Sequence, residues 1–304
     1  MILTGTCSWT EKTLIQSGKF YPKEANTAEA RLRYYAETFD TVEIDSTYYA
    51  IPNPSNSSLW AERTPEKFIF NVKAYGALTG HGVDPRTLPA DIRKTLPQGE
   101  VEKKHIYIKD SSLLKTVAEM FREALEPLVK GGKLGVLVFQ YPPWFQYSKA
   151  GFDFILQGKE LMDGLPVALE FRHGSWLTPE KRDKVLEFLS KNNITYIAAD
   201  EPQYGTLATV PFVPALTSDI AYFRFHGRNK ENWLRKGIET TLRFAYKYSE
   251  EELRGFVPAI EQISKRAKTT LVMFNNCHLD YAVRNAIGMR ELLTRTGETV
   301  RTTE

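Results

Sequence analysis

The chain has 304 residues, of which 42% are apolar and 25% charged, the ordinary composition of a globular protein. Its 40 basic and 37 acidic residues leave a formal charge of +3, which says little about partners, so any basic patch must be local. No apolar run reaches the roughly 18 residues of a membrane span, the N-terminus lacks the pattern of a signal peptide, and two cysteines cannot build a disulfide framework. We therefore expect a soluble, cytoplasmic protein with no membrane partner.

Eight short segments rich in β-forming residues recur along the chain, and most are nearly continuous apolar runs. They are residues 2–6, 41–47, 68–74, 134–142, 166–172, 195–200, 221–227 and 269–276. Such runs are typical of parallel strands that are covered on both faces.

Helical patterns lie between most of these segments. They are predicted over residues 27–39, 111–129, 149–162, 178–192, 249–267 and 278–293. The pattern at 111–129 is the clearest, because five apolar residues fall on one stripe behind a serine cap. Thr178 and Ser249, each with acidic residues close behind, are typical helix starts.

The alternation of strand and helix predicts an α/β fold, a single (β/α)8 TIM-type barrel. We expect this domain over residues 1–294 and a polar, frayed tail over residues 295–304. The alternative is a doubly wound open sheet, but the chain carries neither the G-x-G-x-x-G fingerprint nor the P-loop expected of such a sheet.

Two connections are too long for plain loops, residues 75–110 and residues 227–248. Both leave the carboxyl ends of strands, the face where barrels keep their active sites. Loops of this length commonly serve as lids or binding walls, and we expect 75–110 to be a lid insertion. The alternative is structural decoration with no role in the site.

Charged residues recur at alternate positions of the strands. In the second segment Glu43, Asp45 and Thr47 alternate with Val42 and Ile44, so the acids must point into the barrel if the apolar residues meet the helices. The same test and the ends of the other strands add Asn71, Lys73, Gln140, Glu170, Arg172, Asp200, Arg224 and His226. We therefore expect a polar pocket at the carboxyl-terminal mouth; the alternative is a self-satisfied network of ion pairs.

The cations of this pocket would bind an anion. Lys73, Arg172 and Arg224 offer fixed donors, and guanidinium groups suit carboxylate or phosphate. We expect a small anionic or phosphorylated ligand.

The acids of the pocket could do chemistry. Glu43, Glu170 and Asp200 could serve as acid and base with His226, or could hold Mg, Mn or Zn for phosphoester hydrolysis. No H-x-H or H-E-x-x-H spacing supports a metal. Two carboxylates could also hydrolyse glycosides, whereas the absence of G-x-S-x-G argues against a serine hydrolase.

Aromatic residues crowd the same strand ends. They are Trp9, Tyr48, Tyr49, Tyr141, Trp144 and Trp176. Such rings could stack on a base or a sugar, or could simply pack the long loops.

Taken in order, short strings of the chain resemble the YecE-like family of uncharacterised TIM-barrel proteins, a domain of unknown function. The strings are GTCSW (5–9), FYP (20–22), TVEIDSTYYAIP (41–52), FNVKA (70–74), FQYPP (139–143), EFRHGSW (170–176), YFRFHGR (222–228), YKYSEEEL (246–253) and FNNCH (274–278). Asp45 stands where the family usually has Asn, which makes the pocket more acidic.

The resemblance implies a TIM barrel with no established activity, and a set of recurrent polar positions. These fall on Glu43, Thr47, Tyr49, Lys73, Gln140, Glu170, Arg172, Trp176, Asp200, Arg224, His226, Gly227, Asn275 and Asn276. The set largely coincides with the pocket inferred from strand alternation. We assign Glu43, Glu170, Asp200 and His226 to catalysis. The residues assigned to ligand binding are Tyr49, Lys73, Gln140, Arg172, Trp176, Arg224, Asn275 and Asn276.

The FNNCH string ends the last strand, which neighbours the first in a closed barrel. Cys277 and Cys7 should therefore lie close together on one rim, both reduced. One of Asn275 and Asn276 should face the pocket, and the other would cap a helix that starts near His278. A metal-ligand role for His278 is the less favoured alternative.

Three functions remain open. The favoured one is an enzyme that acts on an anionic or phosphorylated substrate. A nucleic-acid-binding or repair protein is the second, suggested by the basic segments 228–230 and 235–236. The third is a carrier of a small ligand without catalysis. The oligomeric state is not indicated.

Overall fold

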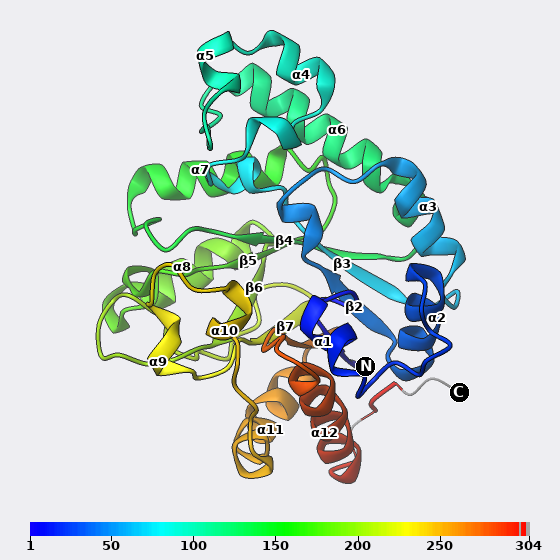
Figure 1. Ribbon diagram of the computed structural model, residues 1–304. Coiled ribbons are helices and arrows are strands. Elements are labelled where there is room, and N and C mark those ends of the chain that lie inside the picture. Colours follow the sequence, from blue (N-terminus) through cyan, green and yellow to red (C-terminus); the bar gives the residue numbers. More distant parts are fainter. Residues whose placement is uncertain (298, 302–304) are drawn as a thin grey trace.

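The computed structural model describes residues 1–297 and 299–301, and eight parallel strands close into a barrel at its centre (Figure 1). The strands are β1 (Ile2–Thr6), β2 (Thr41–Ile44), β3 (Ile69–Lys73), β4 (Leu134–Gln140), β5 (Val167–Glu170), β6 (Thr195–Asp200), β7 (Ile220–Phe225) and β8 (Thr269–Phe274). They follow one another around the barrel in chain order, and β8 pairs in parallel with β1. The predicted (β/α)8 fold is confirmed.

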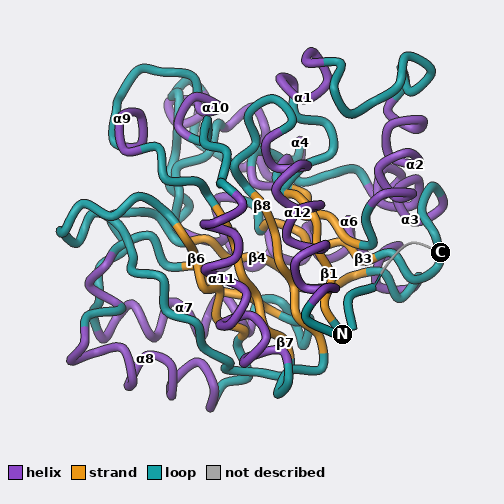
Figure 2. Tube along the Cα trace, turned by 90° about the horizontal axis from the view of Figure 1, so that it is seen from below, coloured by secondary structure: helices purple, strands orange, loops and turns teal. Residues whose placement is uncertain are grey.

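Helices surround the barrel (Figure 2). The α-helices are α1 (Lys12–Ser17), α2 (Ala28–Thr38), α3 (Pro54–Glu62), α4 (Ala90–Thr95), α5 (Gln98–Val101), α6 (Ser111–Lys130), α7 (Lys149–Glu160), α8 (Pro179–Lys191), α9 (Lys230–Trp233), α10 (Thr240–Arg243), α11 (Glu250–Ser264) and α12 (Tyr281–Arg295). The 3-10 turns are η1 (Ser46–Tyr48), η2 (Gly76–Thr79), η3 (Pro85–Thr87) and η4 (Gly174–Trp176). Among the residues described, no helix combines the length and the apolar character that crossing a membrane requires.

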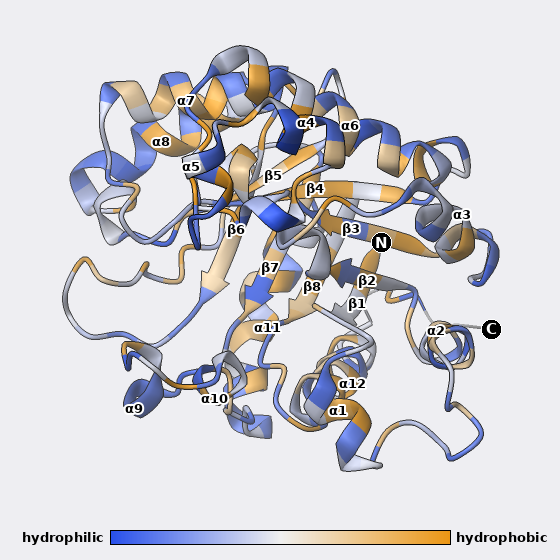
Figure 3. Cartoon of the chain, turned by 45° about the horizontal axis from the view of Figure 1, so that its top comes forward, coloured by the Kyte–Doolittle hydropathy of each residue, from blue (hydrophilic) through white to orange (hydrophobic). Residues whose placement is uncertain are grey.

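The apolar core has two parts, one between the strands and the helices and one inside the barrel. Apolar segments gather on the strands, while the helices carry mixed faces (Figure 3). The barrel interior is filled by Leu3, Cys7, Val136, Val138, Ala168, Ile197, Tyr222, Leu271 and Met273. These residues fix which face of each strand points inward, and charged side chains that follow them on the same faces come together at the carboxyl ends.

Gly5 allows β1 to approach β2 closely. A Cβ atom at this position would lie 2.3 Å from the carbonyl oxygen of Thr41, a distance that real contacts do not reach. The barrel therefore needs glycine at this position because the two backbones are in contact, and not because the backbone adopts a φ angle that only glycine allows.

Several predicted element ends differ from the structure. Asp110, not a serine, caps α6, because its side chain accepts a hydrogen bond from the amide of Leu113. The capping box of Ser249 and Glu252 is present at α11, whereas Thr178 makes no capping bond within the described chain. The strands β2, β5 and β7 end at least two residues earlier than predicted, since the chain turns away where the hydrogen bonds to the neighbouring strands end.

The C-terminal tail is not wholly frayed. Val300 forms a parallel bridge with Ile2, and Arg301 pairs with Asp40 at 3.2 Å. A short part of the tail thus extends the pairing beside β1, and residues 298 and 302–304 lie outside the described chain.

The two long connections contain short helices. The first, residues 75–110, carries α4 and α5, which lie beside α6 rather than over the strands in Figure 1, and its beginning borders the barrel mouth. The second, residues 227–248, carries α9 and α10 and packs over the end of β7.

Candidate functional site

A fully buried guanidinium lies at the centre of the mouth. Arg224 donates to both oxygens of Glu43, at 2.5 and 3.1 Å, and to Oε2 of Glu170 at 2.8 Å. Its Nη2 also lies 3.3 Å from Asp45, and Tyr222 donates to Oε2 of Glu43 at 2.5 Å. The forked guanidinium therefore ties β7 to β2 and β5 in the interior, and each charge is paired.

Oε1, the second carboxylate oxygen of Glu170, is contacted by three more side chains. His226 Nε2 lies 2.9 Å away, Arg172 Nη1 donates to it at 3.1 Å, and Gln140 Nε2 donates at 2.8 Å. On the other side of the imidazole, the amide nitrogen of Asn275 lies 2.8 Å from Nδ1 of His226. A tautomer with its proton on Nε2 would donate to Glu170 and accept from Asn275.

Three charged side chains of the cluster reach solvent. Asp45 is 27% exposed, Lys73 13% and Arg172 17%. Lys73 Nζ lies 3.6 Å from Asp45, and Arg172 Nη1 lies 3.4 Å from Glu201. The mouth therefore shows two cations and one acid to the outside, in front of a network that is closed to water.

Two carboxyl groups of the cluster have pKa values near neutrality. Burial raises the pKa of Glu43 to about 7 against the opposing effect of Arg224, and the neighbouring Asp45 adds to the rise. Burial likewise raises the pKa of Glu201 to about 7, although Arg172 opposes it. Groups that exchange a proton near pH 7 are characteristic of acid–base sites.

His226 and Glu170 have the opposite tendency. Burial lowers the pKa of His226 to about 3, so the imidazole is neutral at physiological pH. Burial opposes the charge on Glu170, but His226, Arg224 and Arg172 outweigh it and lower the pKa of Glu170 well below its usual value. The pair is therefore a neutral imidazole bonded to an ionised carboxylate.

The connection after β7 roofs this part of the site. The guanidinium of Arg172 lies 4.8 Å from the ring centre of Trp233, and His226 meets the rings of Trp233 and Phe244 at 5.9 and 6.0 Å. The connection can turn over the site because Gly227 has a φ of +87° and a Cβ there would lie 2.7 Å from Tyr246.

Comparison with known proteins decides the family. Residues 3–304 match the family described as "Protein of unknown function DUF72". The chain belongs to this family. It is 30% identical over 296 residues to the UPF0759 protein YunF of Bacillus subtilis (strain 168), which covers 96% of this chain and 95% of that one.

Solved DUF72 structures share the fold over nearly the whole chain. One from Thermotoga maritima MSB8 is 30% identical, with a TM-score of 0.76 over 97% of this chain and 99% of that one. One from Enterococcus faecalis V583 is 27% identical, with a TM-score of 0.77 over 97% and 96%. The resemblance and the fold predicted from the sequence are thus confirmed, and the names of these DUF72 proteins assign no activity.

Asp200 does not join the cluster of this DUF72 protein. The inner face of β6 carries Ile197, so Glu201 points inward and Asp200 lies on the opposite face. Asp200 accepts bonds from Arg228 at 2.8 and 2.9 Å and from Tyr248 at 2.6 Å. Its predicted place in the pocket is wrong, and Glu201 fills that place.

Three of the six aromatic residues at the strand ends are packing residues. Trp176 is fully buried, stacks on Phe171 and Phe145, and donates to the carbonyl of Phe145 at 2.7 Å. Trp9 and Tyr141 are also buried. The predicted role of Trp176 in ligand binding is therefore not supported, because its N–H and its ring are already engaged by Phe145 and Phe171.

Of the two asparagines in the DUF72 string FNNCH, only Asn275 faces the cluster. Asn276 donates to the carbonyl of Tyr246 and to Asn285, both at 2.8 Å, and so lies outside the mouth. It caps no helix, since α12 begins at Tyr281, and His278 precedes that helix.

Cys7 and Cys277 lie together on one rim, as predicted. The amide of Cys7 donates to the carbonyl of Phe274 at 3.0 Å, and Sγ of Cys277 lies 3.8 Å from the same oxygen. Both thiols are free, and burial raises the pKa of each.

No group of three or more His, Cys, Asp and Glu side chains in the described part of the chain is placed to hold a metal ion. The oxygens of Glu43 and Glu170 are already engaged by Arg224 and its neighbours. Thr47 has a structural role, since its hydroxyl donates to the carbonyls of Ile44 and Lys73.

Sequence reasoning missed Glu201, Trp233 and Phe244. The signal for Glu201 was its position directly after Asp200, one residue beyond the predicted strand end. No sequence signal pointed to the two rings, because a residue in a long connection can fold back anywhere along the rim.

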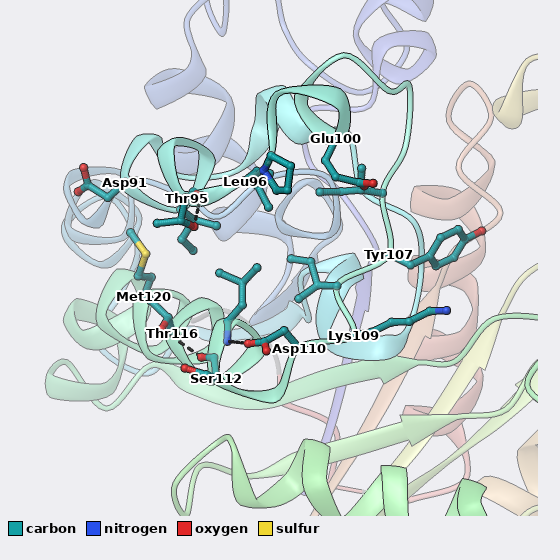
Figure 4. A pocket seen from close by; sticks show the side chains of 15 residues that line it. Asp91, Thr95, Leu96, Glu100, Tyr107, Lys109, Asp110, Ser112, Thr116 and Met120 are labelled. Carbon is teal, nitrogen blue, oxygen red and sulfur yellow. Dashed lines mark hydrogen bonds between the residues drawn. The ribbon is translucent and has the colours of Figure 1, made fainter.

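A separate pocket of about 950 Å³ lies between α4 and α5 on one side and the first half of α6 on the other (Figure 4). Its floor is apolar, and residues such as Tyr107, Lys109 and Asp110 border it. None of the charged residues of the mouth lines it, so this pocket and the charged cluster are separate features of the molecule.

Proposed function

We propose that the protein is an enzyme that acts on a small anionic or phosphorylated ligand at the barrel mouth, with Arg172 as the anchor. Nη1 of Arg172 is held by the buried Glu170, and Nε2 of His226 lies 3.0 Å from the same nitrogen. Within residues 1–297 and 299–301 its other two nitrogens make no hydrogen bond, and the side chain is partly exposed. A guanidinium fixed on one side and free on the other is suited to bind a carboxylate or phosphate.

Lys73 supplies a second cation to the same ligand. Its side chain is partly exposed, and in the described structure the ammonium contacts Asp45 and the ring of Tyr48 and makes no hydrogen bond. An arriving anion would therefore gain two cationic partners without breaking a buried pair.

Glu201 is the proposed general acid–base. It is buried beside Arg172, its pKa is about 7, and its Oε2 has no hydrogen bond in the part of the chain described. A carboxyl group with this pKa exchanges protons efficiently at neutral pH. Glu43, Glu170 and His226, predicted to be catalytic, are proposed instead to position Arg224 and Arg172, because their polar atoms are already bonded to one another.

No metal takes part in the proposed reaction, because Glu43 and Glu170, which would have supplied ligands, are bonded to Arg224. Phosphoester hydrolysis, in which Glu201 would deprotonate a water, is one reaction of the proposed class. For the nucleic-acid alternative, Arg228 lends little support, because Asp200 and Glu252 already bind it.

Calorimetric titration and turnover assays with a panel of phosphorylated and carboxylate metabolites test the proposal. A compound that binds should bind at least tenfold more weakly to Lys73→Met and Arg172→Met, while Lys94→Met, an exposed lysine of α4, should leave the affinity unchanged. Glu201→Gln should bind the compound but lose turnover, which in the native protein should rise as the pH passes about 7.

Lys73→Met keeps the test valid if Arg172→Met fails to fold, since the charged partner of Lys73 is Asp45, which is itself partly exposed. Binding that is the same in Lys73→Met, Arg172→Met and the control would refute the ligand site. Binding without turnover of any bound compound would identify a carrier rather than an enzyme.

A further inference from the structure

Four aromatic rings form a row along the mouth, and Lys73 lies against the second of them. Tyr49 meets Tyr48 at 5.0 Å between ring centres, Tyr48 meets His81 at 5.1 Å, and His81 meets Trp144 at 5.6 Å. The ammonium of Lys73 lies 5.0 Å from the ring centre of Tyr48. Residues from the connections after β2, β3 and β4 thus build one continuous surface, which we call the ring row.

The two ends of the ring row are open to solvent. Tyr49 is 63% exposed and Trp144 is 57% exposed, in contrast to the buried Trp9, Tyr141 and Trp176 of neighbouring strand ends. Each end ring has one neighbour in the row, so at least one of its faces stays clear of the row. An exposed aromatic face beside a binding site is suited to stack on a planar group.

The ring row is uncharged at neutral pH although it borders two cations. Burial, Lys73 and Arg172 together lower the pKa of His81 to about 4. His81 also lies near the proposed anion site, because it meets Tyr48, the ring that Lys73 contacts. The surface therefore passes from the cations Lys73 and Arg172, beside the middle of the ring row, to a neutral aromatic ring at each end.

A pocket of about 430 Å³ adjoins Trp144. It is lined by Thr79, Gly80, Pro142, Trp144, Phe145, Gln146, Tyr147, Ser148 and Phe154, and none of these described residues is charged. The hydroxyl of Thr79 bonds to His81, and that of Ser148 caps α7. Such a lining leaves few groups for the many hydroxyls of a sugar, and it suits a heterocyclic ring.

We infer that the ligand is a nucleotide, an inference that rests on the proposed function. The phosphate would lie on Arg172 and Lys73, and the base would stack on the ring row at Trp144 or Tyr49. The order of chemistry along the surface, from cations to neutral rings, matches the order of groups in a mononucleotide. Stacking on these rings would not discriminate strongly among bases, since every base has a π face.

Calorimetric titrations with adenosine 5′-monophosphate and with ribose 5-phosphate distinguish the contribution of the base to the affinity from that of the phosphate. Native protein should bind the nucleotide more tightly than the sugar phosphate. Trp144→Ala or Tyr49→Ala should weaken binding of the nucleotide roughly 5- to 150-fold, the range for one stacked base, and leave ribose 5-phosphate within about twofold. Tyr107→Ala is the matched control, since Tyr107 is 57% exposed and lies outside the ring row.

Failure of nucleotide binding can be told apart from failure of the proposed anion site. Nucleotide affinity that is unchanged in both Trp144→Ala and Tyr49→Ala, with ribose 5-phosphate still dependent on Arg172, overturns the nucleotide inference and leaves the anion site standing. Failure of both compounds and of the wider metabolite panel to bind removes the anion site, and the nucleotide inference with it.

Discussion

Replacing Arg224 with Met tests the buried network at the mouth. The change removes a cation that contacts Glu43 at 2.5 Å and Glu170 at 2.8 Å, and all three side chains are fully buried. Removing one partner of a buried pair costs about 3–5 kcal/mol, because the other charge is left uncompensated. We expect a loss in this range at pH 8, a large part of the roughly 5–15 kcal/mol that stabilises a typical domain.

The loss should be smaller at low pH. Burial already raises the pKa of Glu43 above its unfolded value of 4.5 against the opposing effect of Arg224, so removing Arg224 would raise it further. A carboxyl group with a raised folded-state pKa contributes stability below its unfolded pKa and loses that contribution as the pH rises through the folded value. The variant should therefore lie closer to the native protein at pH 5 than at pH 8.

Urea unfolding followed by far-ultraviolet circular dichroism measures both effects, with unchanged slopes showing that only stability differs. Arg254→Met is the matched control, because Arg254 pairs with Glu250 on the surface of α11 and its loss should cost less than about 1 kcal/mol. A cost for Arg224→Met that equals the control and does not change between pH 5 and pH 8 would refute the assignment of a charged, buried network.

Three further predictions concern single positions. Because the pKa of Glu43 is raised from 4.5 to about 7, its ionisation lowers the free energy of unfolding as the pH rises through 7. In urea titrations Glu43→Gln should therefore lose less stability than the native protein between pH 5 and pH 9. An equal loss of stability in the two proteins would contradict this. Gly5→Ala should destabilise the fold severely, since the new Cβ would lie 2.3 Å from a carbonyl oxygen of β2. Gly255→Ala, in the open face of α11, is the control and should increase the stability of the fold by about 0.5–1 kcal/mol. Equal melting temperatures of the two variants would count against the close approach of β1 to β2. Cys7 is fully buried and burial raises its pKa, whereas Cys277 is partly exposed, so at most one thiol of the native protein should react quickly with a thiol reagent at pH 8. The unfolded chain should show two thiols, and fast reaction of both in the native state would disprove the burial of Cys7.

Strand alternation was sufficient to place the centre of the site. Glu43, Glu170 and Arg224 lie within their strands, where the regular alternation of faces fixes the side-chain direction. The reasoning failed at Asp200, the last residue of β6. That strand contains two adjacent alanines, so hydrophobicity does not show which face is inner, and the prediction took the wrong one of two neighbouring acids.

The parts of the site that come from long connections could not be predicted. Trp233 reaches Arg172 because the chain turns back at Gly227, and no periodic pattern records such a turn. The same limit applies to the aromatic residues, because Trp176 and Trp144 both follow strand ends in the sequence, yet one is buried and the other exposed. Exposure depends on which loops cover each ring, a long-range property of the fold.

A crystal structure of the protein grown with adenosine 5′-monophosphate tests the central claim most directly. The anion site predicts phosphate density within hydrogen-bond distance of the free nitrogens of Arg172 and of Lys73 Nζ. Nucleotide bound instead in the pocket between α5 and α6, with the mouth unchanged, would contradict the assignment of the mouth as the ligand site.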